Sequence, residues 1–104
     1  MLKLKTIGAA AALTLALAFP ALAANHDVTI QGMKFSPANI EVNAGDTITF
    51  TNKDSAPHTA TASDGSFDTG RLGKGDSAKV TVAAGSHAYI CKIHPMMKGK
   101  VTAN

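Results

Sequence analysis

The chain of 104 residues contains a single cysteine, Cys91, and no tryptophan. One cysteine excludes an intrachain disulfide, so no covalent cross-link holds this fold together. Aromatic residues make up only 5% of the sequence, which predicts a thin hydrophobic core. After the first 23 residues there is no long apolar run, so we expect no membrane-spanning segment in the rest of the chain.

Residues 1–23 have the pattern of a secretory signal peptide. Lys3 and Lys5 give it a positive start, and the apolar stretch that follows is too short to span a membrane. The run Ala21-Leu22-Ala23 is a small-residue cleavage site. We therefore expect cleavage after Ala23, export to the periplasm, and a mature chain of residues 24–104. No cysteine stands directly after the cleavage site, so we also expect no lipid anchor.

Charge gives no sign of a nucleic-acid partner. The formal net charge is +3, but two of the lysines belong to the signal peptide. Residues 24–104 carry eight basic and seven acidic side chains, a balance of +1. A nucleic-acid-binding domain would show a clustered excess of basic residues.

Apolar and polar residues alternate in several short runs, as they do in half-buried strands. The apolar members are Val28 and Ile30, Ile40 and Val42, Ile48 and Phe50, and Ala78, Val80 and Val82. Glycine-containing turn sequences, which separate strands, occur at residues 43–46, 63–65, 73–76 and 84–86. This spacing predicts one all-β domain, an antiparallel β-sandwich, over residues 24–104.

The run Cys91-Lys92-Ile93-His94-Pro95-Met96-Met97 is the most informative part of the chain. A thiolate, an imidazole and a thioether so close together form a soft ligand set, and such sets select copper. His58 supplies a second imidazole far upstream. Two histidines and one cysteine in a plane, with a weak axial methionine, are the ligands of a blue-copper centre.

Three other interpretations of Cys91 have to be weighed. A lone cysteine is often a small buried hydrophobe, although a histidine three residues later favours a ligand. Zinc also binds cysteine and histidine, but a thioether is a poor fourth ligand for it. A catalytic Cys–His pair would need a third polar group and an oxyanion hole, and the sequence offers no convincing candidate for either.

The chain resembles a small bacterial cupredoxin, closest to the amicyanin and plastocyanin group. The resemblance extends from about Asp27 to Val101. It rests on Met33-Lys34-Phe35, the strand Gly45–Asn52, Pro57-His58, and the segments Tyr89-Ile90-Cys91 through Val101, with the short Cys-x2-His-x2-Met spacing of amicyanin.

The resemblance implies a Greek-key β-sandwich of the cupredoxin type that binds one copper ion. The implied ligands are His58, Cys91, His94 and Met97, with Met97 rather than Met96 in the axial position. Asn52 matches the family's asparagine that ties the two ligand loops together. His87 stands where the family has an aromatic residue, and we interpret it as a structural histidine near the core.

With four protein ligands there is no open position for a substrate, so we expect a monomeric electron carrier and no enzymatic activity. Redox partner proteins are expected to dock near His94, Pro95 and Met96. A rim of Lys53, Lys92, Lys98 and Lys100 would favour partners with acidic surfaces.

The alternatives are a periplasmic copper-delivery protein on the same fold and an exported sandwich without metal. Cleavage would also create Ala24-Asn25-His26, a terminus able to enclose a second Cu(II) in a square plane.

Overall fold

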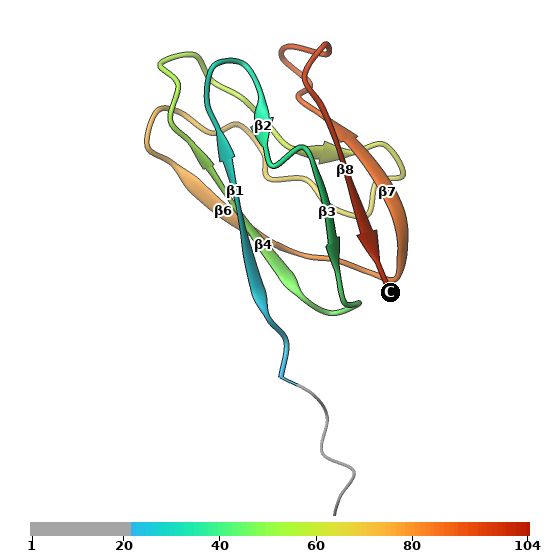
Figure 1. The fold of residues 1–104 in the computed structure, drawn as a ribbon. Coiled ribbons are helices and arrows are strands. Elements are labelled where there is room, and N and C mark those ends of the chain that lie inside the picture. Colours follow the sequence, from blue (N-terminus) through green and yellow to red (C-terminus); the bar gives the residue numbers. More distant parts are fainter. Residues whose placement is uncertain (1–21) are drawn as a thin grey trace, which may run out of the picture.

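The computed structural model describes residues 22–104, which form a β-sandwich of eight strands without a helix (Figure 1). The strands are β1 (Asn25–Ile30), β2 (Phe35–Ser36), β3 (Asn39–Val42), β4 (Thr47–Asn52), β5 (Thr61–Ala62), β6 (Ser77–Thr81), β7 (Gly85–Ile90) and β8 (Lys98–Ala103). The predicted all-β sandwich is confirmed. Nearly all of the predicted signal peptide lies outside the described residues. No helix of the described part of the chain is long and apolar enough to cross a membrane.

The two sheets are mixed rather than purely antiparallel. One has the order β2-β1-β4-β6 and the other the order β3-β8-β7-β5. Strands β1 and β4 pair in parallel, as do β3 and β8. This differs from the expected antiparallel pairing because the chain changes sheet between β2 and β3 and again between β3 and β4. A connection through the opposite sheet lets β4 run in the same direction as β1.

The core lies between the sheets and is formed by the inward side of each alternating strand. In β4, Ile48, Phe50 and Asn52 are fully buried while the threonines between them are partly exposed. The rings of Phe35, Phe50, Phe67 and Tyr89 form one connected cluster, with neighbouring centroids 4.7–6.3 Å apart. The aromatic residues of the described part of the chain are therefore gathered at one place, where edge-to-face contacts add to their burial.

Strand β8 packs against Tyr89 through a glycine. Tyr89 pairs with Gly99 in the register between β7 and β8, and its side chain is 1% exposed. A methyl group at Gly99 would overlap with the Tyr89 ring. The absence of a side chain at position 99 thus makes the space that this ring occupies.

His87 is a structural histidine of strand β7, as the sequence suggested. Its ring is buried, and each ring nitrogen faces an acceptor: Nδ1 lies 2.6 Å from Asp64 Oδ2 and Nε2 lies 2.7 Å from the Ala83 carbonyl oxygen. Both nitrogens can donate only in the imidazolium. The Ala83 carbonyl and then the Asp64 carboxylate raise the pKa of His87. Hydrogen bonds from Ser66, and then from His87, lower the pKa of Asp64 to about 2.

We expect the protein to lose stability as the pH rises above about 6.5 because the pKa of His87 is raised in the folded state. A folded-state pKa above the unfolded value of about 6.5 gives stabilisation that is complete below that value. This stabilisation disappears as the pH rises through the folded pKa. The loss should be on the order of 1 kcal/mol in the free energy of unfolding, measured by chemical denaturation at several pH values.

The matched variant is His87→Phe, which fills the same position with an uncharged ring. Its free energy of unfolding should lack the loss that wild type shows in this pH range. A wild-type curve parallel to that of His87→Phe would contradict the imidazolium assignment.

Candidate metal centre

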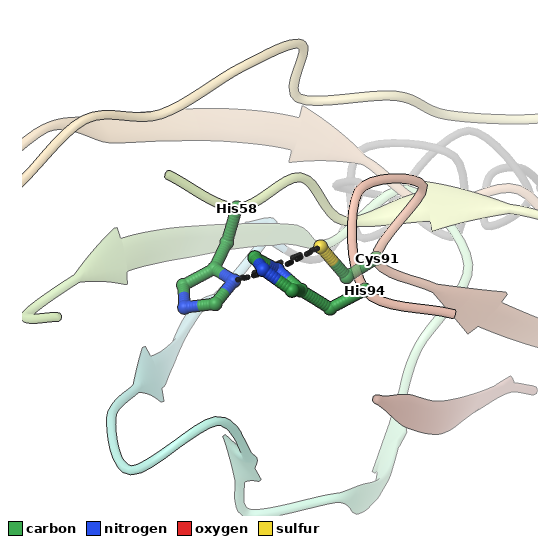
Figure 2. Close-up of side chains that lie close together, drawn as sticks. All are labelled: His58, Cys91 and His94. Atoms are coloured by element: carbon green, nitrogen blue, oxygen red, sulfur yellow. Dashed lines mark hydrogen bonds between the residues drawn. The ribbon is translucent and has the colours of Figure 1, made fainter. Parts of the chain in front are cut away.

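Three side chains from two distant parts of the sequence, His58 and the Cys91–His94 loop, lie close together (Figure 2). His58 lies between β4 and β5, Cys91 directly follows β7, and His94 lies in the loop between β7 and β8. His58 and Cys91 are fully buried, whereas His94 is partly exposed. The end of β7 thus positions Cys91, an isolated β-bridge with Leu72 positions His58, and His94 lies at the surface.

The three potential ligand atoms form a small triangle. Cys91 Sγ lies 3.7 Å from His58 Nδ1 and 3.9 Å from His94 Nδ1, and the two Nδ1 atoms are 3.2 Å apart. Metal–nitrogen bonds of about 2.0–2.1 Å and a metal–sulfur bond of about 2.3 Å in a trigonal plane give sulfur–nitrogen separations of roughly 3.8 Å. The triangle therefore has the dimensions needed to hold one metal ion, and a thiolate with two imidazoles suits copper.

A carboxylate outside the triangle fixes the orientation of His58. His58 Nε2 lies 3.0 Å from Asp54 Oδ2, which leaves Nδ1 facing Cys91 and His94. Asp54 in turn accepts hydrogen bonds from the backbone N–H groups of Gly32 and Met33, at 2.8 and 3.0 Å. The Met33 and Gly32 bonds lower the pKa of Asp54, so it is a carboxylate at neutral pH. A carboxylate that accepts from the outer nitrogen of a metal-binding histidine sets its tautomer and increases its basicity.

Thr59 links the loop of His58 to the loop of Cys91. Its backbone N–H points at Cys91 Sγ at 3.4 Å, and its hydroxyl accepts a hydrogen bond of 2.9 Å from the Lys92 N–H. This donor orients the sulfur that would bind the metal. Sequence reasoning missed Thr59, and its only signal was its place directly after His58.

Asn52 has a different role from the one that the resemblance implied. Its amide donates to the carbonyl oxygens of Ala56 and Leu72, both at 2.9 Å, and its oxygen accepts from the Asp54 N–H at 2.9 Å. It therefore braces the loop that carries His58. The tie between the two loops of the site comes from Thr59.

The loop that carries His94 is closed by its own backbone. The Met97 N–H donates to the His94 carbonyl at 2.9 Å, and the Cys91 N–H donates to the Met97 carbonyl at 3.1 Å. Met97 is 2% exposed, whereas Met96 is 70% exposed. The two methionines thus lie in different environments, and the buried one is suited to the interior of the site.

An apolar surface surrounds the exposed edge of His94. Ile93 and Met96 are exposed large hydrophobic residues, and Pro95 beside them is also exposed. Met33, also exposed, belongs to this surface because its N–H bonds to the same Asp54 that holds His58. The sequence did not predict Met33 as part of this surface because it stands more than sixty residues before His94.

Comparison with known proteins decides the family. The family model of the cupredoxin-like domain matches residues 6–103. The chain belongs to the cupredoxin-like family. Amicyanin-alpha of Methylorubrum extorquens is 34% identical over 85 residues, which cover 76% of this chain and 71% of that protein. Amicyanin of Paracoccus denitrificans is 35% identical over 85 residues, which cover 71% of this chain and 61% of that protein.

Solved cupredoxin structures have the same fold. The Cu(I) form of an amicyanin mutant superposes with a TM-score of 0.70 at 28% identity, covering 86% of this chain and 89% of that one. A purple cupredoxin from Nitrosopumilus maritimus gives a TM-score of 0.67 at 30% identity, covering 76% and 99%. Family membership and the cluster of His58, Cys91 and His94 together indicate that this cupredoxin binds copper.

Proposed function

We propose that residues 24–104 form a periplasmic blue copper protein that carries single electrons between redox partners. The observation that carries the proposal is the buried triangle of Cys91 Sγ and the Nδ1 atoms of His58 and His94, with one histidine at the surface. The proposed ligands are these three residues and Met97. Copper bound there would supply the couple between Cu(I) and Cu(II). Periplasmic location follows from the predicted signal peptide and its cleavage after Ala23.

The contacts of Cys91 and His58 limit the movement of the site, which favours rapid electron transfer. Cys91 provides the sulfur ligand, which accepts a hydrogen bond from the Thr59 N–H. His58 is fixed between Asp54 and the core, so it cannot rotate when the charge of the site changes. Preorganised groups of this kind keep the reorganisation that accompanies a change of charge small.

His94 is the proposed path for electrons to and from partners. It is the only one of the three clustered side chains that reaches the surface, and apolar residues surround it. An exposed apolar patch marks a contact surface. We place partner docking at His94, Pro95 and Met96 and extend the surface to Met33. The protein then needs no substrate pocket, in keeping with an electron carrier rather than an enzyme.

The basic rim around this surface is smaller than the sequence implied. Lys92 Nζ lies 3.1 Å from Asp68 Oδ2, and both side chains are largely exposed. This pair adds little stability, but it neutralises much of the charge that Lys92 offers to a partner. Attraction of acidic partners therefore depends mainly on Lys53, Lys98 and Lys100.

A copper titration with optical and spin-resonance detection tests the proposed function. One equivalent of copper should produce strong visible absorption, and the colour should disappear and return in cycles of one-electron reduction and oxidation. Tight binding of one equivalent without strong absorption or reversible cycling would favour the delivery protein. Failure to bind copper in stoichiometric amount would leave an exported sandwich without metal.

The axial position is tested by replacing each methionine separately with leucine. Met97→Leu should shift both the reduction potential and the spectrum, because it removes the buried thioether that the proposal places beside copper. Met96→Leu is the matched control: the same change at an exposed neighbour should leave both nearly unchanged and affect partner docking instead. The opposite pattern in voltammetry would transfer the axial role to Met96.

A further inference from the structure

A buried carboxylate lies at the pole of the sandwich opposite the metal centre. Asp46 precedes β4, and its side chain is 5% exposed. It accepts the Asn43 N–H at 3.0 Å and lies 2.9 Å from His26 Nε2 and 3.0 Å from the backbone nitrogen of Ala24. Figure 1 shows the start of β1 at one end of the sandwich and the β7–β8 loop at the other.

The bond from Ala24 stands out because this is the residue at which the mature chain is expected to begin. Asn43 belongs to the turn that leads into β4, so its bond to Asp46 is local. Ala24, in contrast, comes from 22 positions earlier in the sequence, and its nitrogen points at Asp46 Oδ1. In the uncleaved chain this nitrogen is an amide with one hydrogen to donate. After cleavage it becomes a primary ammonium.

We propose that Asp46 is a built-in binding site for the α-ammonium group that signal-peptide cleavage creates at Ala24. The proposal rests on cleavage after Ala23. Hydrolysis of the Ala23–Ala24 peptide bond gives a carboxylate on the leaving peptide and an ammonium on Ala24. The ammonium takes the place of the amide at 3.0 Å from Asp46 Oδ1, and a neutral hydrogen bond becomes a charge-assisted one.

Asp46 is ionised and ready to accept this group. The hydrogen bond with His26, followed by those from Ala24 and Asn43, lowers the pKa of Asp46 to about 2. Thr47, the next residue, donates its N–H to the Ala24 carbonyl at 2.9 Å, so both ends of Ala24 are held against the start of β4. Processing thus adds an ion pair to a terminus that the sheet already positions.

The same contacts prevent the terminal motif Ala24-Asn25-His26 from binding Cu(II) as the sequence suggested. That motif needs a free amine, two backbone amides and the imidazole of His26 around one ion. In the structure Asp46 contacts both Ala24 and His26, and residues 25–30 pair along β4. Enclosing copper would require the start of β1 to leave the sheet. We therefore infer that the folded mature chain binds copper at one site only.

The first test compares the mature chain, which begins at Ala24, with a chain extended by its own Leu22 and Ala23. Both are copper-loaded, and their unfolding is measured by chemical denaturation from pH 6 to pH 11. At pH 6–7 the equilibrium constant for unfolding should be about fivefold to tenfold smaller for the mature chain, because only that chain has the ion pair.

The pH dependence of this difference in stability shows whether the α-amine of Ala24 causes it. Pairing with Asp46 raises the pKa of the α-amine above its ordinary value of about 7.7–8.0. The extra stability is then complete below the ordinary value and disappears as the pH rises through the raised one. Equal stabilities at pH 6–7, or an ordinary pKa for the α-amine in an NMR titration, would overturn the proposal.

Asp76, in the turn before β6, provides a matched control for the substitution of Asp46. Its carboxylate accepts the Gly73 N–H at 2.9 Å and its N–H donates to the Gly73 carbonyl at 3.0 Å, as Asp46 does with Asn43. Asp46→Asn should remove the stability difference between mature and extended chains. Asp76→Asn should preserve it, since it affects a turn bond alone. Loss of the difference in both variants would assign it to general weakening of the fold.

Two further measurements test separately the premise, which is cleavage after Ala23, and the pairing of the new ammonium with Asp46. Mass spectrometry of the exported protein shows whether the chain begins at Ala24, and a different start would overturn the physiological role. A titration with Cu(II) at neutral pH should stop at one equivalent for the mature chain and reach two after Asp46→Asn. Uptake of a second equivalent by the unaltered mature chain would show that its terminus is free and would contradict the pairing.

Discussion

Replacing Cys91 with serine is expected to abolish the intense visible absorption of the copper-loaded protein. That absorption requires charge transfer from a thiolate, and Cys91 is the only cysteine in the chain. A serine hydroxyl is a harder and more weakly binding ligand, so the affinity for copper should also fall. Both effects are measured in one titration followed by absorption and spin-resonance spectroscopy.

Ile93→Ser is the matched control for this substitution. It places the same residue type in the same loop, two positions away, at a side chain that is 37% exposed. This variant should keep the colour and bind one copper ion. An intensely coloured Cys91→Ser variant would contradict the assignment of the thiolate, and loss of colour in both variants would point to collapse of the loop instead.

The sequence predicted the strands whose buried positions carry large apolar side chains. Alternation identified β1, β3, β4 and β6. Strands β2 and β5 escaped because each has only two residues, too few for a period of two to be recognised. Strand β8 was not predicted because one of its inward positions is Gly99, and glycine is typical of turns. Its role depends on the Tyr89 ring, which only the fold places beside it.

The candidate centre was predictable to the extent that its chemistry lies in unusual residue types. A lone cysteine followed by a histidine and two methionines is rare enough to mark a site, and the structure brings His58, Cys91 and His94 together. The supporting residues are ordinary. Asp54 and Thr59 have no distinctive pattern, and their importance comes from contacts with His58, Cys91 and Lys92 that only the folded loops create.

Gly99→Ala is expected to destabilise the protein by about 3 kcal/mol or more. An added methyl group would overlap with the buried ring of Tyr89, and overpacking of a core costs about 1–3 kcal/mol, more where neighbours cannot move. The Tyr89 ring has little freedom because it packs against Phe35 and Phe50. Domains of this length have free energies of unfolding of about 4–12 kcal/mol, so the loss is a large fraction of the total.

Gly73→Ala is the control, because an added methyl group there meets only the flexible side chain of Asp76, at 3.2 Å. Its free energy of unfolding should stay within about 1 kcal/mol of wild type. Making room with Tyr89→Leu should recover part of the Gly99→Ala loss, as a double-mutant cycle would show. Tyr89 and Gly99 also pair where β7 and β8 flank the Cys91–Met97 loop. Gly99→Ala should therefore change the copper spectrum as well, and an unchanged spectrum with full stability would show that the ring yields without moving that loop.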